Sequence, residues 1–228
     1  QYTVINHGNP VNPVYDFDCN MTGDGSGWTY TCDWENRLVV AEKTGQRLEF
    51  KYDYMSRRVE KRVLDGGTET KKERFVYDAY LQIEQLNALD SNAIEKKRIW
   101  NNNGQIISEI QGANTYYAVS DANKNVTEYI DASGTIQGHF EFSPSGKITL
   151  ANGTNPDAFD FIYSSEYFDT ETELVYYNFR YYNPILGRWL SREPMEEKGS
   201  LNLYMHCNNN SINMVDMFGR NALWDFWK

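Results

Sequence analysis

The sequence predicts an all-β fold made of antiparallel hairpins. Segments of about four to eight residues rich in Tyr, Val, Ile, Phe and Thr recur along the chain, separated by clusters of Asp, Asn, Gly and Ser. The chain has 17 tyrosines and a mean hydropathy of −0.68, a combination typical of sheets whose faces are partly solvated. Stretches with a helical period are almost absent. The exceptions are a region of mixed periodicity at Leu81–Asn87 and one turn of helix near Asn208–Met214.

A degenerate repeat marks the ends of the predicted strands. Each unit has an aromatic or apolar residue, then a polar residue, a turn and an apolar residue. The polar residue falls at Asp33, Asp53, Asp78, Asn101, Asp121, Asp131 and Ser143. An aspartate there accepts backbone N–H bonds just downstream and forms an Asx-type turn, after which Gly or Asn supplies a positive φ. The repeat therefore predicts one strand–turn–strand unit per step.

The position that needs a positive φ differs between the units. Gly or Asn fills it at Asn36, Gly104, Gly134 and Gly146. Leu81 and Lys124 stand there in two other units, and neither side chain suits a left-handed backbone. We therefore expect altered turns in these two units.

Charge and cysteine content exclude several classes of partner and site. A net charge of −10 and a pI near 4.8 argue against nucleic acid and anionic membranes as partners, since both need a basic surface. No run approaches the ~20 apolar residues of a membrane span. The odd number of cysteines, at irregular spacing, gives no disulfide framework or metal knuckle. A bridge between Cys19 and Cys32 in an oxidising compartment stays open.

Longer motifs follow the repeats in a fixed order. The stretch YYAVSDANKNVTEYIDASGTIQGHFEFSPSG precedes FDFIYSSEYFDTETELVYYNFRYYNPILGRWLSREP and then NLYMHCNNNSINMVDMFG. In order and spacing, Tyr116 to Gly219 resembles the Rhs repeat-associated core domain. The upstream units resemble the YD repeats that Rhs proteins share with teneurins and toxin-complex C proteins, and the whole resemblance covers about Tyr30 to Gly219.

The resemblance implies four segments and an architecture. Residues 1–29 are unassigned and look internal to a longer chain, 30–115 are degenerate YD repeats, 116–219 are the core domain, and 220–228 begin a variable C-terminal region. Family members wind such strands into a spiralling, cocoon-like sheet that the core domain plugs at one end. A spiral of mutually bonded turns leaves few free strand edges, which suits a secreted shell.

The resemblance also implies a function. The expected role is a bacterial shell, secreted or displayed at the cell surface, that encloses and delivers a toxin domain carried at its own C-terminus. Its partners would be that toxin, the rest of the shell and the export machinery, with no cofactor. Only Asn221–Lys228 follow the core, too few residues for a toxin domain.

In toxin-complex relatives the core domain is also an aspartyl autoprotease that cuts just after the core. The residues that match its catalytic positions are Arg180, Glu193 and Asp216, with the cut expected after Arg220. Two carboxylates held close share a proton, so that one acts as acid and the other as base. The arginine would bias that sharing and polarise the scissile carbonyl.

Three departures from the family pattern bear on this activity. Glu193 replaces the aspartate of SxDP, Met217 replaces the proline of DPxG, and Arg220 replaces an apolar residue before the cut. The alternative is that Arg180, Glu193 and Asp216 form an ordinary salt-bridge and turn network in the plug.

A rival function from another class is glycan binding or adhesion. The aromatic faces of the repeated tyrosines and of several tryptophans would suit stacking on sugars, although such rings more often pack between strands. The tryptophans concerned are Trp28, Trp34, Trp100 and Trp189.

Other constellations do not form a predicted site. Asp16, Asp18 and Asn20 begin like a calcium loop, but Met21 and Gly27 occupy its glycine and glutamate positions. The histidines, His7, His139 and His206, have no partners at metal-ligand spacing. His206 and Cys207 would point to opposite faces of a strand, which argues against a Cys/His dyad. We therefore expect no metal site.

Overall fold

The computed structural model describes residues 4–6, 9–194, 202–220 and 222–224. Most of the described chain forms one antiparallel sheet of 14 strands, in which each strand pairs with its neighbours in sequence. The predicted all-β, hairpin-based fold is confirmed. Leu81–Asn87 is a strand of this sheet. None of the helices in the described part is long and apolar enough to cross a membrane.

The elements have the following bounds. The large sheet contains β3 (Val14–Tyr15), β4 (Met21–Gly23), β5 (Thr29–Cys32), β6 (Leu38–Lys43), β7 (Gln46–Tyr52), β8 (Arg58–Asp65), β9 (Thr68–Asp78), β10 (Leu81–Asn87), β11 (Ala93–Trp100), β12 (Ile106–Gln111), β13 (Asn114–Ser120), β14 (Val126–Asp131), β15 (Ile136–Phe142) and β16 (Ile148–Asn152). A second sheet contains β17 (Tyr167–Asp169), β18 (Leu174–Tyr177), β19 (Arg180–Asn183) and β20 (Arg188–Trp189). Two hairpins pair β1 (Val4–Asn6) with β2 (Asn9–Val11) and β21 (Met214–Asp216) with β22 (Ala222–Trp224). Short 3₁₀ turns are η1 (Pro156–Ala158), η2 (Tyr163–Ser165) and η4 (Cys207–Asn209).

The repeated aspartates cap the turns at one end of these hairpins. In the turn between β7 and β8, Asp53 Oδ1 accepts the backbone N–H groups of Met55 at 2.9 Å and Arg57 at 3.0 Å. The fourth residue of this turn, Ser56, has φ of 63°. The same carboxylate or amide cap occurs at Asp33, Asn101, Asp121 and Asp131.

One of the two altered turns is confirmed, and the other prediction is wrong. The unit with Leu81 has only two residues between Asp78 and Leu81, and Ala79 takes φ of 48°. Lys124, by contrast, adopts φ of 64° in a turn of the usual length, because Asp121 caps it like the other turns. The cap therefore imposes a left-handed backbone on a residue that rarely adopts one.

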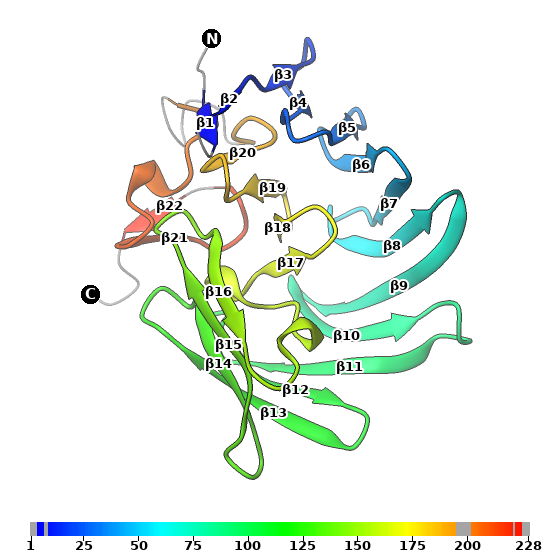
Figure 1. Cartoon of the computed structure of the whole chain (residues 1–228), viewed down its shortest axis with the longest axis vertical. Helices are drawn as coiled ribbons and strands as arrows, with labels where there is room; N and C mark the ends of the chain where they lie inside the picture. Colours follow the sequence, from blue (N-terminus) through cyan, green and yellow to red (C-terminus); the bar gives the residue numbers. More distant parts are fainter. Residues whose placement is uncertain (1–3, 7–8, 195–201, 221, 225–228) are drawn as a thin grey trace.

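The segment after the large sheet packs against its concave side. Figure 1 shows the strands from β3 to β16 curving around β17, β18 and β19. We call residues 156–194 and 202–220 the plug. Its tyrosines and Trp189 form a joint core with rings and aliphatic groups of the sheet. Tyr116, the expected first residue of the core domain, lies inside β13, and the sheet continues through it without a break. The division into repeats and core domain stays a prediction.

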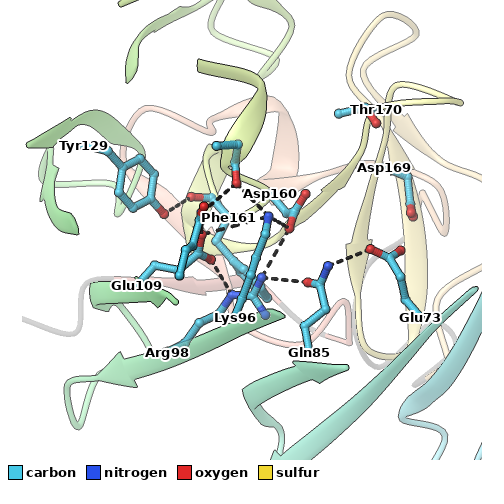
Figure 2. Close-up of polar contacts among 12 residues, drawn as sticks. Glu73, Gln85, Lys96, Arg98, Glu109, Tyr129, Asp160, Phe161, Asp169 and Thr170 are labelled. Carbon is cyan, nitrogen blue, oxygen red and sulfur yellow. Dashed lines mark hydrogen bonds and ion pairs between the residues drawn. The ribbon is translucent and has the colours of Figure 1, made fainter. Parts of the chain in front are cut away.

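A row of charged side chains crosses the sheet beneath the plug. Figure 2 shows part of this row, which joins neighbouring strands to Asp160 of the plug. Arg98 donates to Glu109 at 2.7 Å and to Gln85 at 2.8 Å, and both partners are buried. Gln85 in turn donates to Glu73 at 2.6 Å. We call this row the charged ladder. Its members on the sheet are Arg58, Lys61, Glu73, Gln85, Lys96, Arg98 and Glu109.

Asp169 of the plug closes the ladder at its other end. Its Oδ2 lies 2.6 Å from Arg58 Nη1, and its Oδ1 lies 2.7 Å from Lys61 Nζ. Arg58 and Asp169 are both 0% exposed. Because a buried charge needs a partner, the plug and the sheet each neutralise charges that the other buries.

Candidate functional site

The structure brings the three predicted catalytic residues together inside the plug. Arg180 lies at the start of β19, Glu193 follows β20, and Asp216 ends β21. Arg180 Nη2 is 2.7 Å from Glu193 Oε2 and 3.5 Å from Asp216 Oδ2. All three side chains are buried, with exposures of 3%, 5% and 2%.

Arg180 is held from several sides. Its Nε donates to the carbonyl oxygen of Gly219 at 2.5 Å, and its Nη1 donates to that of Leu203 at 3.3 Å. The guanidinium also lies over the ring of Trp189, 4.0 Å from the ring centre. Burial lowers the pKa of Arg180, against the opposing effect of Glu193 and Asp216. Arg180 therefore has a fixed orientation toward both carboxylates.

Asp216 caps a turn of the same kind as the repeat aspartates. Its Oδ1 accepts the backbone N–H groups of Phe218 at 3.2 Å, Gly219 at 2.7 Å and Arg220 at 3.1 Å. Gly219, three residues after the aspartate, has φ of 70°. The sequence carried the signal for this further unit, because Gly219 stands after Asp216 as Gly134 stands after Asp131. The predicted repeats end at Ser143 and did not include this unit.

The second oxygen distinguishes the Asp216 turn from the others. In the β7–β8 turn, Asp53 Oδ2 bonds Arg57 of the same turn at 2.7 Å. Asp216 Oδ2 instead faces Arg180, from another part of the plug. Arg180 Nη2 therefore lies between the two carboxylates.

The residues beside the expected cut are only partly described. Arg220 is exposed, and its guanidinium lies 4.6 Å from the ring centre of Phe179. Asn221, the other side of the expected bond, lies outside the described residues. Asp216 nevertheless fixes the backbone up to Arg220, because its Oδ1 accepts the N–H of Arg220. The residue before the expected cut is therefore part of a capped turn.

Comparison with known proteins decides the family. A family model described as the teneurin YD-shell matches residues 14–212. This chain belongs to the YD-shell family. The tRNA3(Ser)-specific nuclease WapA of Bacillus spizizenii is 30% identical over 240 residues, which cover 96% of this chain and 10% of that protein. The probable deoxyribonuclease RhsB of Dickeya dadantii is 26% identical over 190 residues, covering 80% of this chain and 13% of that protein.

A solved structure supports the same fold. The YD-shell chain is similar to the crystal structure of TcdB2–TccC3, with a TM-score of 0.71 at 22% identity. The match covers 88% of this chain and 11% of that one. The YD-shell chain therefore spans about a tenth of the length of these relatives.

Most of the tryptophans proposed for glycan stacking do not have an exposed ring. Trp189 is 0% exposed, Trp28 is buried beneath Lys43, and Trp100 donates its indole N–H to the carbonyl oxygen of Gln82. Trp34 alone of this set projects into solvent, at 96% exposure. Glycan binding by this YD-shell segment stays a prediction, and it would need exposed rings such as those of Trp34 and Tyr54.

The prediction that His206 and Cys207 are neighbours on a strand is wrong. His206 and Cys207 are not on a strand, because Cys207 begins η4, and Cys207 Sγ lies 3.5 Å from His206 Nε2. Burial raises the pKa of Cys207 to about 12 and lowers the pKa of His206 to about 3. A neutral thiol and a neutral imidazole therefore lie together, without the thiolate that a nucleophile needs.

The remaining polar candidates have structural partners. Asp16 Oδ1 accepts the backbone N–H of Asn20 at 2.8 Å, and His139 Nδ1 lies 3.0 Å from Glu128. His7 lies outside the described residues. Within the described ranges no three His, Cys, Asp or Glu residues are grouped to hold a metal ion. The cysteines Cys19, Cys32 and Cys207 are free thiols.

Proposed function

We propose that this chain is part of a shell that encloses and delivers a toxin domain carried further along the same protein, secreted or displayed at the bacterial surface. The observation that carries the proposal is a YD-shell sheet that curves around its own plug. Two relatives with this segment carry nuclease names, and the segment makes up only a small share of each. The nuclease activity would then belong to the remainder of such proteins. This segment would form part of the shell wall, through its sheet, and would close the shell with its plug.

The proposal predicts that closure protects what lies inside. In the longer protein, the domain downstream of this chain should resist proteinase K while the shell is intact. Asp169→Ala should make it sensitive, because the substitution removes the carboxylate that pairs with Arg58 and leaves that buried charge uncompensated beneath the plug. Gel analysis of timed digests measures this.

A surface substitution provides the matched control. Arg47→Met removes an exposed pair with Glu42 and should leave protection unchanged. Digestion of the downstream domain in the unsubstituted protein at the rate of the isolated domain would contradict enclosure.

The geometry of the plug supports self-cleavage after Arg220 as a second activity. Arg180 lies between two carboxylates and also bonds the carbonyl of Gly219, the residue before Arg220 at the expected cut. Intact mass of a chain extended by its native downstream sequence tests it: the unsubstituted chain should be cut at Arg220–Asn221, and Asp216→Asn should stay whole.

A second turn aspartate separates chemistry from turn structure. Asp131→Asn alters an equivalent cap far from Arg180 and should leave cleavage intact. An unsubstituted chain as uncut as Asp216→Asn would leave only the salt-bridge and turn network.

A further inference from the structure

A cavity of about 220 Å³ lies where the turns of the large sheet meet the plug. Its lining comes from the turns after β9, β11 and β13 and from plug segments beside β17, β18 and β21. Most of the lining surface is aromatic or apolar. The rings are those of Tyr77, Tyr80, Trp100, Phe161, Tyr167, Tyr176 and Phe218.

The shortened turn of the repeat leaves room for this cavity. Between β11 and β12, three residues separate Asn101 from Gln105, whereas two separate Asp78 from Leu81. Ala79, Tyr80 and Leu81 of the short turn line the cavity. A departure from the repeat thus coincides with a space that the plug does not fill.

Lys124 brings an amine to this cavity. Its Nζ is buried and has no hydrogen-bond partner among the described residues. Burial lowers the pKa of Lys124, although Glu166 and Asp216 oppose this. The same residue has the left-handed backbone that other units give to Gly, Asn or Ser. An unpaired amine on an unfavourable backbone is a costly choice for a purely structural position.

Glu166 is the acidic residue that lines the cavity. It is 8% exposed, and burial raises its pKa well above the usual range. No ion pair joins it to Lys124 within the described chain. A raised pKa makes the carboxyl of Glu166 hold its proton more readily, and a protonated carboxyl donates a hydrogen bond.

We propose that this cavity binds a small carboxylate carried on a single aromatic ring, with the Lys124 amine pairing with the carboxylate and the aromatic walls enclosing the ring. The size fits, because a cavity of ~150 Å³ holds one benzene ring, and this one is larger, at about 220 Å³. An aromatic enclosure with a few convergent polar groups is the usual form of a small-molecule site. Such a group arises in a free aromatic acid or in a peptide chain that ends in phenylalanine.

Calorimetric titration of the full chain tests the proposal. The probes are 3-phenylpropionate, its neutral amide, and N-acetylglycylphenylalanine with a free carboxylate. The acid should bind at least about ten-fold more tightly than the amide, since only the acid forms the charge-assisted bond to Lys124. Tighter binding of the peptide than of the acid assigns the site to a chain terminus, and the reverse assigns it to a free acid.

Lys124→Asn is the decisive variant. Asparagine suits the left-handed backbone and removes the buried amine, so the thermal midpoint should be no lower than that of the unsubstituted chain. Binding of 3-phenylpropionate should weaken at least about ten-fold. Lys97→Met, on the exposed side chain of β11, is the control and should bind unchanged.

Several results would overturn the proposal. Equal affinity of the acid for Lys124→Asn and the unsubstituted chain would remove Lys124 from the site. Equal affinity of the unsubstituted chain for the acid and the amide would show that the carboxylate charge does not contribute to binding. Absence of binding by the folded, unsubstituted chain at millimolar acid would remove the site altogether.

Discussion

The large sheet and the plug are held by opposite kinds of interaction. In the sheet, the turns at one end of the hairpins are fixed by a side-chain oxygen that bonds residues two and four places further on, as at Asp53 and Asp131. The contacts that fix the plug to the sheet instead join residues far apart in sequence, such as Arg58 with Asp169, and they are buried. The sheet is therefore specified locally, and the plug only by its fit to the completed sheet.

The difference locates the weak point of the molecule. Loss of one local cap disturbs one hairpin, because its neighbours keep their own caps. Loss of Asp169 instead leaves the charge of Arg58 buried in the sheet without its carboxylate partner. The following predictions test this contrast from the largest expected effect to the smallest.

Asp169→Ala should lower the free energy of unfolding by about 3–5 kcal/mol, since it leaves Arg58 in the interior without its carboxylate partner, whereas Lys61 keeps Glu171. Urea denaturation monitored by tryptophan fluorescence measures the change. Arg47→Met removes exposed pairs and should cost less than about 1 kcal/mol. Similar costs for the two variants would contradict a special role of the buried pairs.

Acid should unfold the plug through Asp160. Burial raises the pKa of Asp160, but Lys96 and Arg98 outweigh it and bring the pKa down to about 2. The unfolded value is about 3.9. Because the folded pKa is the lower one, Asp160 contributes stability above about pH 4 that is lost as pH falls toward about 2.

Asp160→Asn should therefore be less stable at neutral pH and should lose less stability between about pH 4 and about pH 2. Urea midpoints across that range measure it. Asp131, whose bonds to Ser133 and Thr135 also lower its pKa to about 2, lies in an exposed turn and provides the comparison through Asp131→Asn. An unchanged pH dependence in Asp160→Asn would show that the plug is not the acid-sensitive region.

Asp53→Ala should have the smallest effect and lower the free energy of unfolding by about 1 kcal/mol. The two backbone N–H groups that Asp53 caps can donate to water instead. Hydrogen exchange should show faster exchange at Met55 and Arg57 and unchanged protection in β17 and β18. Loss of protection in the plug would mean that the hairpins are less independent than their local bonding indicates.

The sequence predicted what depends on neighbouring residues. The hairpins, their caps and the shortened turn at Leu81 follow from side chains within four positions of one another. Lys124 was misjudged because propensity alone favours another turn, whereas the Asp121 cap overrides it. The grouping of Arg180, Glu193 and Asp216 came from family resemblance, and their spacing alone would not have placed them together.

The charged ladder had no signal in the sequence. Alternation along a strand places Arg98 or Glu109 on one face, but it cannot say whether water or the plug covers that face. The same limit hid the cavity at Lys124, since its walls come from turns and plug segments distant in sequence. What remained unpredictable is thus the set of contacts made when the plug docks.

The order of strands in the large sheet has a consequence for how the protein folds. Every strand from β4 to β16 pairs with the strand before it, so each loop that must close is short and the wall can grow hairpin by hairpin as the chain emerges. The plug contacts reach back much further, as Tyr204 does in its bond to Cys19, 185 residues upstream. Chain connectivity therefore sets the order of folding: the large sheet forms first, and the plug docks on it last.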